Sequence, residues 1–123
     1  MYLVGAEHPN KAIAAGVLAR LALSGEKLVT DAEVLQEILH RYSAINRADA
    51  IQPAFDALLA AAEEVFPIDR AVVEAAKALL MAYPMLSARD SIHLATMHAN
   101  SVSTVFSFDK GFDVVPNVLR ISS

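Results

Sequence analysis

Asp109 stands directly after a run of β-branched and aromatic residues at 104–108, which predicts a strand. Ligands of an open parallel sheet collect beyond the carboxyl ends of its strands, so a carboxylate in this position is placed like a ligand. The Asp-Lys-Gly sequence at 109–111 equally suits an ordinary turn. Asp109 therefore becomes a candidate for chemistry only if other acids converge on it.

Two further carboxylates, Asp90 and Glu37, lie on predicted helices. Asp90 comes three residues after Ser87, and a capping box explains an acid there without any function. Glu37 lies about 60° from Val34 at about 100° per residue, so it borders the apolar side of its helix; an ion pair with Arg41 one turn later is the ordinary alternative. Three such oxygen donors suit Mg²⁺ or Mn²⁺. A site of this kind hydrolyses phosphodiesters, because the metal activates water and offsets phosphoryl charge.

Other chemistries find less support in the sequence. His93 and His98 are five residues apart, not the i, i+4 pair of a zinc-binding helix. His93 is one turn from Asp90 and could pair with it or touch substrate, but a lone helix histidine is usually structural, so we assign it no catalytic role. There is no cysteine, no Gly-rich phosphate loop and no Gly-x-Ser-x-Gly motif, which leaves thiol, nucleoside triphosphate and acyl-transfer chemistry unsupported.

Length and composition set the limits within which these residues act. The 123 residues fit a single domain over 1–123. A net charge of −4 argues against a broad basic face that coats nucleic acid, so any such contact is expected to be local. No apolar run approaches the length of a membrane span, and no leader peptide is evident. We expect a soluble, cytoplasmic protein that makes no contact with membranes.

The elements that would position the acids alternate between strands and helices. Apolar periodicity and capping residues predict five helices. They run over 11–23, from a Thr30–Glu33 capping box to about 42, over 46–62, from Asp69 to Pro84, and over 87–100. Pro53 is the weak point of the third helix. Short β-prone runs predict strands at 27–30, 65–68, 104–108 and 118–122, the second at a sheet edge if Pro67 belongs to it. This alternation predicts an α/β fold with a mostly parallel sheet covered on both faces.

Four motifs in order resemble those of the PIN-domain family, in particular the ribonuclease toxins of bacterial VapBC pairs. They are Glu37-Ile-Leu, LSARDSIHLA at 86–95, FSFDKGF at 106–112 and VPNVL at 115–119. The resemblance implies a three-layer α/β/α fold, with Glu37, Asp90 and Asp109 as ligands of Mg²⁺ or Mn²⁺. It also implies that Asp113 assists these three from the following turn.

The family's first strand has no evident counterpart in the chain. PIN domains begin with a hydrophobic strand that ends in Asp-Thr/Ser-Asn/Ser, whereas residues 1–5 resemble the end of the helix that follows it. We therefore expect the sheet to lack its central strand, which would leave its neighbours about 9.6 Å apart, twice the normal spacing. Either the natural protein begins upstream, which we favour, or the chain fills the gap by rearrangement or with a partner's strand.

The resemblance implies a metal-dependent endoribonuclease that is the toxin of a type II toxin-antitoxin pair, silenced by a small VapB-like antitoxin and forming a homodimer. Arg89 and Lys110, with Arg41 and Arg47, would then guide RNA phosphates, although each could equally be ordinary surface charge. Two alternatives stay open. One is a PIN-like binding module that engages antitoxin or RNA without cleaving it, and the other is an α/β domain whose acids are coincidental.

Overall fold

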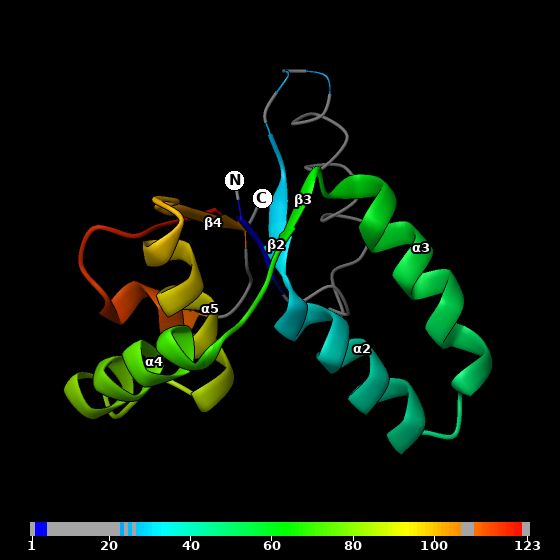
Figure 1. The fold of residues 1–123 in the computed structure, drawn as a ribbon, viewed down its shortest axis with the longest axis horizontal. Coiled ribbons are helices and arrows are strands. Elements are labelled where there is room, and N and C mark those ends of the chain that lie inside the picture. The colour runs from blue at the N-terminus through cyan, green and yellow to red at the C-terminus, as the bar shows by residue number, and fades with distance from the viewer. Residues whose placement is uncertain (1, 5–22, 24, 26, 107–109, 122–123) are drawn as a thin grey trace.

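A parallel sheet of five strands runs through the centre of the protein (Figure 1). The computed structural model describes residues 2–4, 23, 25, 27–106 and 110–121. Its strands are β1 (Tyr2–Leu3), β2 (Val29–Asp31), β3 (Glu64–Phe66), β4 (Thr104–Phe106) and β5 (Leu119–Ile121). They lie in the order β3-β2-β1-β4-β5, and every pairing is parallel. The predicted α/β class, parallel sheet and edge position of β3 are confirmed.

The described helices form two pairs (Figure 1). One pair consists of α2 (Ala32–Ala44) and α3 (Ile51–Ala61), joined through the short 3₁₀ helix η1 (Ala48–Ala50). The other consists of α4 (Arg70–Ala82) and α5 (Ala88–Ala99), which pack against each other on the opposite side of the strands. A second 3₁₀ helix, η2 (Lys110–Val114), follows β4. Four of the predicted helices are thus confirmed, while the one predicted over 11–23 lies almost wholly outside the described residues.

The expectation that the sheet lacks its central strand is wrong. Tyr2 pairs with Val29 of β2 and Val105 of β4, and Leu3 pairs with Phe106, so β1 occupies the middle of the sheet. The physical reason is that a gap of two strand spacings leaves backbone groups unpaired on both sides, and the aromatic and apolar residues at 2–4 are suited to fill it. In this structure residues 2–3 fill the centre of the sheet.

The start of α2 differs from the predicted capping box. Asp31 is the N-cap residue, and its side chain accepts a hydrogen bond from the backbone N–H of Val34. The Thr30 hydroxyl instead donates to the carbonyl of Leu3 at 2.7 Å, across the β1–β2 pair. Thr30 lies one residue before the N-cap, and its side chain ties the central strand to its neighbour.

The third predicted helix begins later than its sequence suggested. Asn46 adopts φ 56°, a conformation that turns the chain, and η1 precedes the regular helix α3. Pro53 then falls in the first turn of α3, where the missing N–H would have no intrahelical partner in any case. Pro53 therefore fixes where α3 begins and does not weaken its interior.

The core lies between the sheet and the helix pairs. Its largest fully buried side chains include Tyr2 and Val105 from the sheet, Val34 from α2, Met97 from α5 and Phe112 from η2. In the part of the chain that the structure describes, no helix is long and apolar enough to cross a membrane. The order of strands reverses between β1 and β4, so the edge beyond the carboxyl ends of the central strands is where such a sheet binds ligands.

Candidate active site

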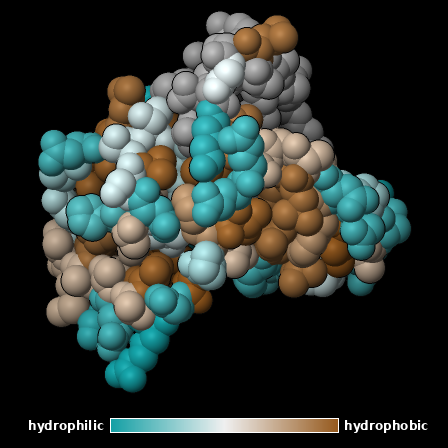
Figure 2. Space-filling model, turned by 45° about the horizontal axis from the view of Figure 1, so that its top comes forward, coloured by the Kyte–Doolittle hydropathy of each residue, from teal (hydrophilic) through white to brown (hydrophobic). Residues whose placement is uncertain are grey.

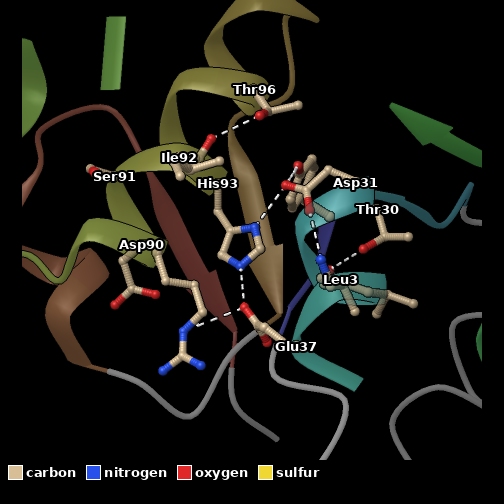
Figure 3. A network of polar contacts seen from close by, with 12 residues as sticks. Leu3, Thr30, Asp31, Glu37, Asp90, Ser91, Ile92, His93 and Thr96 are labelled. Atoms are coloured by element: carbon tan, nitrogen blue, oxygen red, sulfur yellow. Dashed lines mark hydrogen bonds and ion pairs between the residues drawn. The ribbon is translucent and has the colours of Figure 1, made fainter. Parts of the chain in front are cut away.

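Asp31 lies at this edge, and its side chain is fully buried. Its Oδ1 accepts a hydrogen bond from the Val34 N–H at 3.1 Å, and its Oδ2 accepts from the Tyr2 hydroxyl and lies 2.7 Å from Nδ1 of His93 (Figure 3). Burial and the Asp31 charge raise the pKa of Tyr2, which keeps its hydroxyl protonated as a donor. Sequence reasoning missed Asp31 because an Asp before a helix is an ordinary cap. Its place at the end of the apolar run at 27–30 was the signal that could have found it.

His93 links Asp31 to Glu37 from the middle of the site (Figure 3). The ring is 1% exposed, and its Nε2 lies 2.9 Å from Oε1 of Glu37. Burial alone lowers the pKa of His93, but hydrogen bonds to Asp31 and Glu37 and their charges outweigh it and raise the pKa to about 9. At neutral pH both ring nitrogens therefore carry protons and donate. The sequence suggested that His93 could pair with Asp90 or touch substrate. In the structure it contacts the carboxylates of Asp31 and Glu37.

Glu37 lies in the second turn of α2 with its side chain 16% exposed, as its position beside the apolar side predicted. Its partners among the described residues include two on α5: His93, and Arg89, whose Nε lies 3.4 Å from the same oxygen, Oε1. Glu37 thus pairs across to a different helix. The neighbouring Glu33 is half-buried, and burial raises the pKa of its carboxyl.

Asp90 lies in the first turn of α5 and is buried, with 7% of the residue exposed. Its backbone N–H donates to the Ser87 hydroxyl at 3.0 Å, which is the helix cap that its spacing predicted. In Figure 3 the carboxylates of Asp90 and Glu37 lie toward the same side of His93.

The remaining predicted site residues lie in or after the turn that follows β4. Asp109 and the side chain of Lys110 lie outside the described residues. Asp113 is in η2 with its side chain 51% exposed, and it accepts two hydrogen bonds from Arg120 of β5, at 2.8 and 3.1 Å. In the structure Glu37 contacts Arg89 and His93 of the helix that carries Asp90, whereas the described contact of Asp113 is with β5.

Known proteins resemble this chain over nearly its whole length. The PIN domain family model matches residues 1–118. Ribonuclease VapC13 of Mycobacterium tuberculosis and VapC ribonuclease Mb1869c of Mycobacterium bovis are each 52% identical to it over 122 residues, which are 99% of this chain and 93% of the relative. This chain is a VapC-type PIN-domain protein. Ribonuclease VapC23 of Mycobacterium tuberculosis is 35% identical over 109 residues.

Solved structures share the fold of this VapC-type chain at low sequence identity. VapBC2 from Rickettsia felis, bound to a DNA fragment from its promoter, superposes with a TM-score of 0.75 at 15% identity and covers 98% of this chain and 96% of its own. VapC20 of Mycobacterium tuberculosis, described as a toxin that cleaves the sarcin-ricin loop, has a TM-score of 0.70 at 18% identity, and 92% of each chain is covered. These likenesses support the three-layer α/β fold.

PIN-domain VapC nucleases are generally metal-dependent, and the donors in this VapC-type chain fit a hard cation. Glu37 and Asp90 supply carboxylate oxygens, the donors that Mg²⁺ and Mn²⁺ prefer, and Glu37 is held by a hydrogen bond from His93 as metal-binding carboxylates commonly are. Within the described ranges, no group of three His, Asp or Glu side chains is arranged to hold a metal ion. A complete site thus needs a further donor, and Asp109 is the residue that the sequence motif offers.

Proposed function

We propose that this protein is a Mg²⁺- or Mn²⁺-dependent endoribonuclease and the toxin of a type II toxin-antitoxin pair. The observation that carries the proposal is the contact of Glu37 of α2 with Arg89 and His93 of α5, the helix whose first turn holds Asp90. The 52% identity to named VapC ribonucleases supports the same chemistry. The whole chain, residues 1–123, would act as one PIN-like domain.

Glu37, Asp90 and Asp109 would hold the metal, with Asp113 assisting once its bond to Arg120 opens. When bound, the metal lowers the pKa of a water molecule and offsets the charge that builds on the phosphoryl oxygens. The chain's own part is to bring carboxylates from separate helices together and to hold them away from bulk water. The burial of Glu37 and Asp90 keeps the number of competing waters low and strengthens their interaction with a cation.

Arg89 and Lys110 would bind phosphates of the RNA on either side of the scissile bond. Arg89 is suited to this because its side chain is 56% exposed and already lies at the site through its contact with Glu37. A cation bound by Glu37 would compete with that contact and free Arg89 for an anionic substrate. Local contacts of this kind are consistent with an overall charge of −4.

Protein partners are part of the same proposal. Figure 2 shows apolar surface on the side of the molecule where α2 and α3 lie, and Leu39, Ile45 and Leu59 of this helix pair and its connection are each about half exposed. Exposed apolar surface of this kind commonly marks a protein interface. A small VapB-like antitoxin and a second copy of the chain are the proposed partners, and the cytoplasm, where RNA is found, is the proposed location.

The decisive experiment measures RNA cleavage by the purified chain with Mg²⁺ or Mn²⁺ and with EDTA. Asp90→Asn should reduce cleavage by at least about 100-fold, because a lost metal ligand should cost no less than the 10- to 100-fold of an outer-shell partner. Asp69→Asn is the matched control, since it makes the same acid-to-amide change at a helix start and Asn still caps α4. Antitoxin or RNA binding without metal-dependent cleavage would indicate the binding module in place of the enzyme.

A further inference from the structure

A buried series of side-chain contacts runs from Tyr2 of β1 to Glu37, and the proposed function assigns it no role. The Tyr2 hydroxyl donates to Asp31. His93 donates to Asp31 through Nδ1 and to Glu37 through Nε2 (Figure 3). The contacts join two strands and two helices, and each polar group in them except Glu37 is essentially inaccessible to solvent. This series of contacts ends on Glu37, whose carboxylate is a proposed metal ligand.

Stability alone does not account for this arrangement. A cap for α2 needs one acceptor, and Oδ1 of Asp31 already fills that role through Val34. Placing a histidine between two carboxylates in the core costs desolvation that apolar side chains of similar volume would avoid. The contacts of Oδ2 of Asp31 with Tyr2 and His93 go beyond what the cap requires, and the geometry at Glu37 identifies their purpose.

The contact with His93 fixes the direction in which Glu37 presents its carboxylate. Among the described residues, both donors to Glu37 address Oε1, which leaves Oε2 as the oxygen that can be offered to a cation. Arg89 is exposed and lies at 3.4 Å, a weak and readily broken contact, whereas His93 is buried and lies at 2.9 Å. His93 is thus the donor that holds Glu37 before and after substrate arrives.

We propose that His93, oriented by Asp31, is a positioning residue that aims Oε2 of Glu37 into the metal site. The inference rests on the proposed function in that the positioned carboxylate binds the metal. Asp31 fixes the ring plane by accepting from Nδ1, and the fixed ring then holds the flexible Glu37 side chain in one direction. The Glu37 side chain therefore loses its conformational entropy during folding and not when the cation binds.

Calorimetric titration of the metal-free chain with MnCl₂ tests this directly, without an activity measurement. His93→Gln keeps an N–H donor near the position of Nε2, whereas His93→Asn keeps one only near Nδ1, so the two amides separate the two contacts. His93→Asn should raise the Kd for Mn²⁺ by about 10- to 100-fold, and His93→Gln by less than about tenfold, because outer-shell partners typically affect metal affinity on this scale. Leu58→Ala, in the core on α3, is a destabilised control that should leave the Kd unchanged.

Asp31→Asn gives a second test that does not alter the histidine. Asn still caps α2, so the helix start is retained, but the neutral acceptor holds the ring less firmly. The Kd for Mn²⁺ should rise several-fold, and an unchanged Kd would show that Asp31 acts only as a cap. Circular dichroism of each variant confirms that it is folded.

The outcomes separate the inference from the function on which it rests. Equal Mn²⁺ affinities for wild type, His93→Gln and His93→Asn would overturn the positioning role alone. Equal losses in both amide variants would also overturn it, since they would show that only the integrity of the core matters. A wild-type chain that binds no Mn²⁺ would overturn the metal-dependent function, and the inference would fall with it.

Discussion

Replacing Asp31 by Ala should cost far more stability than the same change at Asp69, although the two residues look alike in sequence. Each is an N-cap that accepts a hydrogen bond from the backbone N–H three residues later, at 3.1 Å for Asp31 and 3.0 Å for Asp69. Asp69 is exposed, whereas Asp31 is fully buried and also accepts from Tyr2 and His93. Comparing Asp31→Ala with Asp69→Ala therefore measures what the buried contacts of Asp31 contribute to the free energy of unfolding.

The expected magnitudes follow from these contacts. Loss of the cap alone costs about 1 kcal/mol, which is the whole effect expected for Asp69→Ala. In Asp31→Ala the buried imidazolium also loses one of its two carboxylates and the Tyr2 hydroxyl loses its acceptor, a loss of about 3–5 kcal/mol for a broken buried ion pair. The two variants should thus differ by about 3 kcal/mol or more in free energy of unfolding.

Urea unfolding followed by circular dichroism, in EDTA at pH 7, measures both values on the same scale. Asp31→Asn should fall between the wild type and Asp31→Ala, because Asn keeps the cap and a neutral acceptor but loses the charge. If Asp31→Ala and Asp69→Ala lowered the free energy of unfolding equally, Asp31 would be an ordinary cap. The buried contacts with Tyr2 and His93 would then contribute nothing to stability, contrary to this reasoning.

Three further results are expected. Tyr2→Phe should lower the free energy of unfolding by about 2 kcal/mol in the same urea assay, since it removes a buried hydrogen bond to a carboxylate. In EDTA, stability should be greatest below pH 6.5 and fall as the pH rises toward about 9, because His93 has a folded pKa of about 9 against 6.5 for the free side chain; His93→Gln should lack this fall. Arg89→Ala should raise the KM for RNA several-fold in steady-state cleavage assays while leaving the Mn²⁺ Kd nearly unchanged, and an unaltered KM would contradict its phosphate role.

Much of the fold could be predicted because local signals and global packing agree. The helix α4 shows this best: Asp69 caps it, its apolar residues repeat at helical spacing, and Pro84 follows its end. The same agreement gave β4 and β5 from their β-branched and aromatic runs. The carboxylates Glu37 and Asp90 could be singled out because their spacing within motifs is also a local property of the chain.

The parts that could not be predicted depend on contacts between residues far apart in sequence. Asp31 and His93 are 62 positions apart, and nothing local distinguishes Asp31 from Asp69. The helix spacing of His93 suggested a pairing with Asp90, because neighbours on one helix are all that spacing can show. Only the tertiary arrangement turns His93 toward α2, where two carboxylates hold it as a cation.

Tyr2 takes part in two features that the sequence did not predict, the central strand of the sheet and the orientation of His93. Its backbone closes the centre of the sheet between β2 and β4, and its hydroxyl donates to Asp31 at the carboxyl end of β2. The ring also lies edge-on to the ring of His93, with centroids 6.3 Å apart. Pairing of the central strand and orientation of the histidine are therefore parts of one packing arrangement. A change that displaces β1 should loosen Glu37 even though β1 contributes no carboxylate within residues 2–4, because Tyr2, Asp31 and His93 hold that side chain in series.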